Sequence, residues 1–99
     1  MKPNDNEVIT GSTVLSLYGL RDCKDIDLIY YNNPPVDSHN QYLETHYKLT
    51  LYNIINNPLY HLYYQGFKYV SLDVIANMKR VRNEPKDVVD VQLIEKMGT

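Results

Sequence analysis

Short apolar blocks alternate with turn residues along the first third of the chain. Glu7 to Thr10 reads as a short strand, and apolar residues then recur at helical spacing over about residues 12–18. Gly19 follows at a position where a left-handed cap commonly ends a helix. Residues 25–30 alternate acidic and apolar side chains ahead of a pair of prolines, which interrupt a strand ladder, so we expect a buried strand there.

The middle of the chain is less regular. Residues 38–47 are weakly helical, whereas residues 48–55 are ambiguous, with the alternation in KLTLY favouring a strand. Residues 60–64 and 67–70 are apolar and aromatic and flank Gln65-Gly66, a pattern typical of a β-hairpin. This region therefore predicts a hairpin preceded by a segment of uncertain type.

Two longer helices are predicted near the C-terminal end. The first covers about residues 72–82, and its basic residues gather near its last turn, where they suit the helix dipole. A proline marks the first turn of the second, over about residues 85–97. The wide apolar arc of this helix predicts deep packing against the sheet, and Asp87 and Asp90 would lie along one edge of it.

Composition limits the class of protein. The 99 residues, 43% hydrophobic and 22% charged, fit one small globular domain over residues 1–99. A formal net charge of −2, with no run of Lys or Arg longer than two, argues against broad electrostatic binding of nucleic acid but leaves specific contact with an RNA or DNA end open. The single cysteine excludes an intramolecular disulfide. Without a signal-like or membrane-spanning apolar run, we expect a soluble cytoplasmic protein with no membrane partner.

Asp25 and Asp27 are the first candidates for chemistry. Side chains two apart on a strand share a face, so both carboxylates would lie within reach of one hard cation. Upstream, Gly11 and Ser12 open the first predicted helix, where backbone N–H groups and the helix dipole can bind phosphate, unless Ser12 merely caps the helix. Together they suggest a triphosphate held by the backbone at one end and by metal at the other.

These residues belong to a longer pattern. Its first part consists of Gly11-Ser12, Gly19, Arg21 and Asp25-Ile26-Asp27. Its second part consists of Phe67, Ser71-Leu72, Met78-Lys79, Arg82, Lys86-Asp87 and Asp90. In this order the two parts resemble the nucleotidyltransferase superfamily, in particular minimal nucleotidyltransferases and abortive-infection toxin-type nucleotidyltransferases.

The resemblance implies an α+β (α/β) fold, in which helices pack on a mixed sheet, and an enzyme that transfers a nucleoside monophosphate from a nucleoside triphosphate to an acceptor hydroxyl. Asp25 and Asp27 would be catalytic and would coordinate Mg²⁺ or Mn²⁺, while Gly11 and Ser12 would hold the triphosphate tail. The acceptor is left open between a nucleic acid end, a protein side chain and a small molecule. A protein partner or a homo-oligomer is also left open.

The resemblance also implies roles for basic residues. Candidates for neutralising phosphate charge are Lys79, Arg82 and Lys86. The alternative is a screened charge cluster at the end of a helix, of little energetic weight. For Arg21 two roles are left open, contact with phosphate and structural pairing with Asp87 or Asp90.

The chain departs from the family at one position. Active members usually place a third carboxylate on a neighbouring strand, yet no acid occurs between Glu44 and Asp73. The segments that should carry it offer Asn53 or His61, and a neutral ligand would weaken metal binding and remove a candidate base. Two alternatives therefore stand beside the enzyme: a catalytically reduced module that binds a nucleotide or a partner, and a structural protein.

Overall fold

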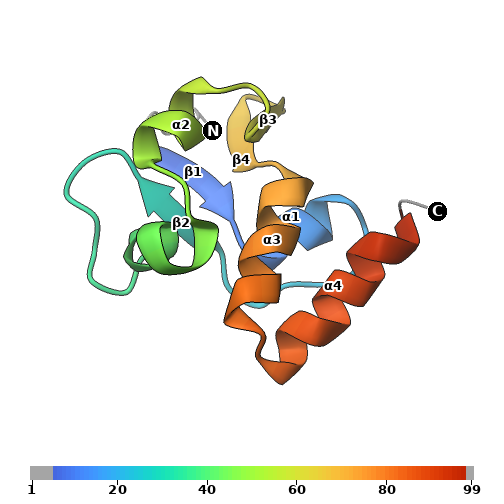
Figure 1. Ribbon diagram of the computed structural model, residues 1–99. Helices are drawn as coiled ribbons and strands as arrows, with labels where there is room; N and C mark the ends of the chain where they lie inside the picture. Colours follow the sequence, from blue (N-terminus) through green and yellow to red (C-terminus); the bar gives the residue numbers. More distant parts are fainter. Residues whose placement is uncertain (1–5, 98–99) are drawn as a thin grey trace.

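The computed structural model describes residues 6–97 and contains one mixed sheet. Its strands are β1 (Glu7–Thr10), β2 (Asp27–Tyr30), β3 (His61–Tyr64) and β4 (Phe67–Val70). They lie in the order β2-β1-β4-β3, with β1 antiparallel to β2 and parallel to β4, and with β3 antiparallel to β4 (Figure 1). The predicted hairpin and the predicted α+β class with a mixed sheet are confirmed.

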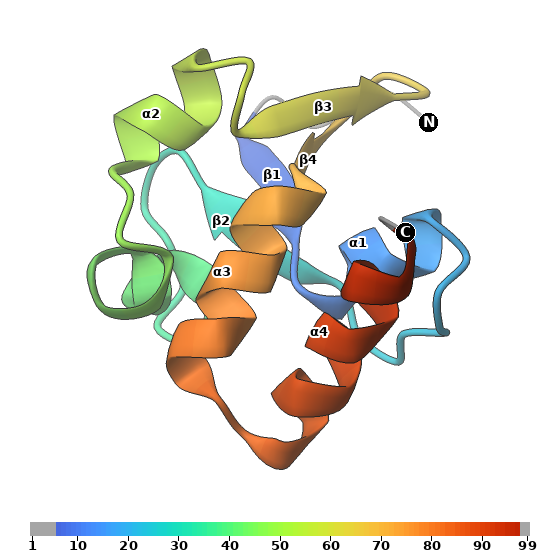
Figure 2. The same cartoon turned by 45° about the vertical axis from the view of Figure 1, so that its right-hand side comes forward.

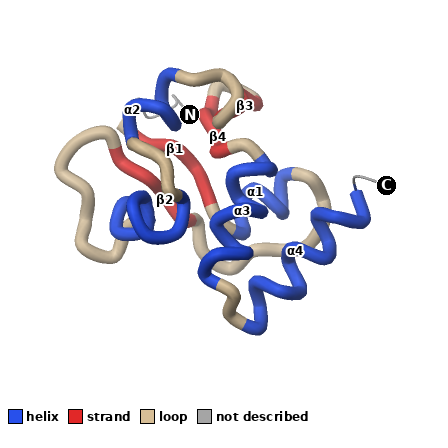
Figure 3. Tube along the Cα trace, viewed as in Figure 1, coloured by secondary structure: helices blue, strands red, loops and turns tan. Residues whose placement is uncertain are grey.

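Helices connect the strands and pack beside the sheet. They are α1 (Ser12–Leu17), α2 (Leu51–Asn56), α3 (Leu72–Arg82) and α4 (Pro85–Met97), with two short helical turns, η1 (His39–Tyr42) and η2 (Leu43–Tyr47), between β2 and α2. α3 contacts α4, α1 and η2, and η1 contacts β2 (Figure 2, Figure 3). Within residues 6–97, no helix has the length and apolar character needed to cross a membrane.

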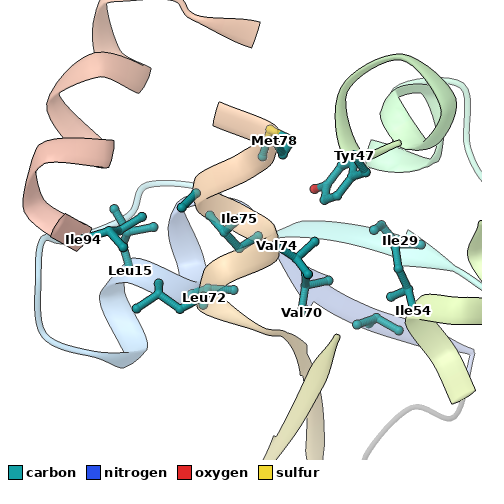
Figure 4. Close-up of a cluster of buried hydrophobic side chains, with 13 residues drawn as sticks. Leu15, Ile29, Tyr47, Ile54, Val70, Leu72, Val74, Ile75, Met78 and Ile94 are labelled. Carbon is teal, nitrogen blue, oxygen red and sulfur yellow. The ribbon is translucent and has the colours of Figure 1, made fainter. Parts of the chain in front are cut away.

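Apolar side chains of the sheet and of α3 meet in one core (Figure 4). Val8, Ile29 and Val70 come from three neighbouring strands, and Ile75 and Met78 come from α3; all five are fully buried. Complete burial of such a side chain contributes about 1.5–3 kcal/mol of hydrophobic stabilisation. This packing holds the end of β1 and the start of β2 in place relative to α3, and the polar residues of the candidate site lie there.

Residues 48–55 do not form the strand that the alternation favoured. Lys48 adopts a left-handed conformation with φ 55° and ends η2, so the first part of this segment is irregular. Thr50 then caps α2, because its hydroxyl accepts a hydrogen bond from the backbone N–H of Asn53 (3.1 Å). In so short a segment the cap decides the structure, and the period-two pattern does not.

The apolar arc of α4 is only partly buried. Val91 and Ile94 face the core, whereas Val88 and Val89 are exposed. The helical spacing that buries Val91 and Ile94 also buries Asp87, one turn earlier. The prediction of deep packing against the sheet is therefore wrong. The main contact of α4 is with α3, and Asp87 occupies a place on its buried face while Val88 and Val89 stay exposed.

Candidate functional site

A cleft of ≈ 400 Å³ gathers residues from Ser12 to Asp90, nearly the whole described chain. Six of the seven predicted site residues line it: Ser12, Asp25, Asp27, Lys79, Arg82 and Lys86. The other lining residues are Arg21, Lys24, Asp37, His39, Gln41, Tyr42 and Asp90. The seventh predicted residue, Gly11, is buried against Asp27. Tertiary structure thus brings both parts of the sequence pattern to one place.

Gly11 has a structural role beside the carboxylate of Asp27. It follows Thr10, which pairs with Asp27 across β1 and β2, and its φ of +70° favours glycine. A Cβ at this position would overlap Oδ2 of Asp27. The sequence suggested that a phosphate would approach the backbone at Gly11. In the structure the Asp27 carboxylate lies there instead. Phosphate binding by Gly11 stays a prediction.

Asp25 and Asp27 line the same cleft but do not share a strand. β2 begins at Asp27, so the prediction of a common strand face is wrong. Asp25 lies in the preceding segment, which is tied to α1 by a hydrogen bond from Thr13 Oγ1 to the Asp25 carbonyl (3.3 Å). The Asp25 carboxylate makes no hydrogen bond or ion pair within residues 6–97, so it is open to a ligand.

A buried chain of two hydrogen bonds holds His39 beside the Asp27 carboxylate. His39 Nε2 lies 3.5 Å from Asp27 Oδ2, and His39 Nδ1 lies 2.8 Å from the hydroxyl of Tyr47. That hydroxyl is 2.6 Å from Thr10 Oγ1. Burial lowers the pKa of His39, although Asp27 opposes the shift, and burial raises the pKa of Tyr47. A neutral imidazole that donates from Nε2 toward Asp27 and accepts at Nδ1 fits this chain.

A buried ionic cluster borders the cleft on its basic side. Asp90 accepts two hydrogen bonds from Arg21 Nη1 (2.9 and 3.0 Å), which confirms that Arg21 is a structural partner of α4. Lys79 is 3% exposed, and its Nζ lies 3.1 Å from Asp90 and 3.5 Å from Asp87. The cluster therefore joins the segment after α1 to both α3 and α4.

Asp87 is paired at both of its oxygens. They accept hydrogen bonds from Arg82 Nη2 (2.7 Å) and Nε (2.8 Å), and Oδ2 also accepts from the backbone N–H of Glu84 (3.0 Å). Burial raises the pKa of Asp87, but these hydrogen bonds and the nearby cations outweigh burial and hold the pKa at about 2. The same pair raises the pKa of Arg82, so both groups stay charged at neutral pH.

This pairing changes the roles expected of the three basic candidates. Lys79 and Arg82 direct their charge at Asp87 and Asp90, and Arg82 also pairs with Glu84 at 3.3 Å, so the three cations of the cluster are balanced by three carboxylates. Lys86 is exposed, lines the cleft and makes no hydrogen bond or ion pair with another described residue. Of the three candidates, Lys86 is the best placed to meet a phosphate.

Ser12 faces the cleft and does not cap α1. Gly11 occupies the N-cap position, and Ser12 is the first residue of the helix. Across residues 6–97 the Ser12 hydroxyl has no hydrogen-bond partner, and the residue lines the cleft. The hydroxyl is thus a donor for a ligand.

The sequence analysis missed five lining residues, namely Lys24, Asp37, His39, Gln41 and Tyr42, and Asp37 and His39 are the two that lie at the aspartates. They lie in the segment that turns back beside β2, and nothing in their spacing marks them as partners of the aspartates. Asn40 anchors this return, because its side chain accepts from the backbone N–H of Tyr30 (2.8 Å) and donates to the Tyr30 carbonyl (3.0 Å). An asparagine after a proline turn was the only local signal, and it does not identify the site.

The donor set of the cleft suits a metal that binds together with a phosphate. In the described part of the chain, no three carboxylate, imidazole or thiolate groups form a metal-binding cluster. Mg²⁺ is commonly held by one or two carboxylates together with substrate phosphates, so the chemistry of Asp25 and Asp27 fits such an ion. Comparisons of the chain with models of protein families, with curated proteins and with solved structures found no match.

Proposed function

We propose that the chain is a metal-dependent nucleotidyltransferase that moves a nucleoside monophosphate from a nucleoside triphosphate to an acceptor hydroxyl. One observation carries the proposal: a single cleft combines the carboxylates of Asp25 and Asp27 with five basic side chains. A metal-bound triphosphate needs both kinds of group. The cleft volume of ≈ 400 Å³ also lies within the usual range for small-molecule sites, about 300–1,000 Å³.

Each residue would have a limited task in this reaction. Asp25 and Asp27 would hold Mg²⁺ or Mn²⁺, which neutralises phosphate charge when bound. Lys86 and Ser12 would donate hydrogen bonds to triphosphate oxygens. His39 would hold Asp27 in position from the buried side. The ionic cluster would hold α3 and α4 in place beside the cleft without adding net charge.

A second candidate is a protein that binds a nucleotide or a partner without turnover. It is favoured by the pairing of Lys79 and Arg82 with Asp87, which leaves little basic charge free for a transition state. Only the transferase releases pyrophosphate. Its release from ATP therefore separates the two candidates.

Thermal unfolding with and without Mg²⁺ and ATP tests the metal site. A ligand that binds only the folded state raises Tm by mass action, so the pair of ligands should stabilise wild type and not Asp27→Asn. Asp22→Asn is the matched control, because Asp22 is an exposed acid that does not line the cleft. Equal increments in wild type and Asp27→Asn would refute the metal site, and no increment at all would favour a structural protein.

Titration of Mg²⁺-ATP tests the phosphate contact. Lys86→Gln should weaken binding about tenfold, the effect of losing one charge-assisted hydrogen bond. Lys96→Gln removes the same charge from the same helix outside the cleft, and it should change affinity by less than about twofold because salt screens distant charges. Equal effects of the two substitutions would exclude a direct contact between Lys86 and phosphate.

A further inference from the structure

A second cavity adjoins the cleft. Its volume is ≈ 390 Å³, and four residues line both spaces: Asp25, Asp27, Asp37 and His39. These four residues therefore form the boundary between the two cavities. A group bound at the aspartates would be in reach of both spaces.

The two cavities differ in charge. Five basic side chains line the cleft, whereas none of the lysines and arginines among residues 6–97 lines the second cavity. In addition to the shared residues, the second cavity is lined by one polar residue, Ser38, and by four apolar or aromatic residues, Ile26, Leu28, Tyr30 and Pro35. Ile26 is 65% exposed, so a large apolar side chain stands open to solvent next to two carboxylates. Such a surface suits a ligand with an uncharged or cationic body.

We infer that the second cavity receives the acceptor, and that the acceptor is a hydroxyl compound without negative charge. The inference rests on the proposed nucleotidyl transfer. In that reaction the acceptor oxygen forms a bond to the α-phosphorus, and the bond from this phosphorus to the bridging oxygen breaks. Pyrophosphate leaves with the electron pair, and the hydroxyl proton passes to water. Attack and departure are roughly in line, so acceptor and pyrophosphate lie on opposite sides of the α-phosphate.

Charge decides which cavity holds the pyrophosphate and which receives the acceptor. Pyrophosphate is the most negative group in the reaction, so it belongs with the basic side chains of the cleft. The acceptor then approaches through the second cavity, where Asp37 keeps its negative charge when Asp25 and Asp27 hold the metal, and which no lysine or arginine among residues 6–97 lines. The phosphates of a nucleic acid end would be repelled there, whereas a neutral or cationic compound would not.

Acceptor probes of matched chemistry and opposite charge test this assignment. The donor is ATP labelled in its α-phosphate, with Mg²⁺. Two peptides carry the same serine, threonine and tyrosine, flanked by lysines in one peptide and by glutamates in the other. Ethanolamine and glycolate form a second, small-molecule pair of opposite charge. An oligodeoxynucleotide supplies an anionic polymer with a free terminal hydroxyl. The lysine peptide should be labelled about tenfold faster than the glutamate peptide, ethanolamine faster than glycolate, and the oligonucleotide not at all.

Two variants locate the selectivity in the second cavity. Ile26→Lys adds a cation to this cavity alone, and it should lower the labelling ratio of lysine to glutamate peptide about tenfold. Leu59→Lys makes the matching apolar-to-lysine change just before β3, at the opposite edge of the sheet from β2. This side chain is 77% exposed and lines neither cavity, so the ratio should stay as in wild type. Circular dichroism establishes that both variants are folded.

The outcomes separate the inference from the proposed function. Faster labelling of the glutamate peptide or the oligonucleotide, or an equal change of the ratio in both variants, would overturn the inference and leave nucleotidyl transfer standing. Binding of Mg²⁺-ATP with no label on any probe would overturn the inference as well. If the wild-type protein neither binds Mg²⁺-ATP nor releases pyrophosphate, the proposed function itself is refuted.

Discussion

Replacing Asp87 by asparagine removes one negative charge from the ionic cluster that joins α3 to α4. The new side chain has nearly the same size, but it no longer balances Arg82 at 2.7 Å and Lys79 at 3.5 Å. Asp87 is fully buried and Lys79 nearly so, which keeps water from replacing the lost partner. The variant therefore measures what the cluster contributes to stability.

The structure sets the expected size of this effect. Removing one partner of a buried ion pair costs about 3–5 kcal/mol, because the other charge stays buried without compensation. Lys79 keeps Asp90 at 3.1 Å, and the asparagine oxygen can still accept from the N–H of Glu84, so we expect the lower end, about 3 kcal/mol. That is a large part of the total free energy of unfolding of a small domain, about 5–15 kcal/mol. With a urea m-value of about 1–3 kcal/mol/M, the denaturation midpoint should fall by about 1–3 M.

A pair on the same two helices supplies the control. Arg80 on α3 and Glu95 on α4 lie 3.6 Å apart, and both side chains are exposed. Glu95→Gln should therefore change the free energy of unfolding by less than about 1 kcal/mol. If Asp87→Asn lowers the midpoint no further than Glu95→Gln at an unchanged m-value, the cluster does not stabilise the contact between α3 and α4.

Three further predictions concern single groups. The pKa of Asp87 is lowered from 3.8 to about 2 by folding, so its ionisation stabilises the fold above about pH 4, and this contribution of about 2–3 kcal/mol disappears as the pH falls toward 2. In urea denaturation the gap between wild type and Asp87→Asn should close over that range, and a constant gap would contradict the pairing. Gly11→Ala should cost about 1–3 kcal/mol in thermal unfolding, since its φ is +70° and the added Cβ overlaps Asp27; a neutral result would rule out this packing. Tyr47→Phe should cost about 1–3 kcal/mol by calorimetry, because its partners at 2.6 and 2.8 Å become unpaired in the interior, and an unchanged stability would argue against the buried chain.

Local patterns predicted the elements that depend on neighbouring residues. The hairpin of β3 and β4, the helices α3 and α4, and β1 all appear where the periodicity places them. The two errors of assignment have local causes of a different kind. The cap at Thr50 turned an alternating segment into α2, and β2 begins two residues later than the alternation indicated. Short segments carry too few residues for periodicity alone to decide.

The sequence by itself also identified most of the chemical groups, because acids and bases in a characteristic order are visible without a fold. It could not show that Lys79 and Arg82 are paired with the acids of α4, since that depends on the rotation of α4 that buries Asp87 and exposes Val88 and Val89. Nor could it show Asp37 at the boundary of two cavities. Side-chain chemistry is a property of the residue, whereas burial, pairing and charge balance depend on contacts between residues far apart in the chain, and only packing of the whole structure determines those contacts.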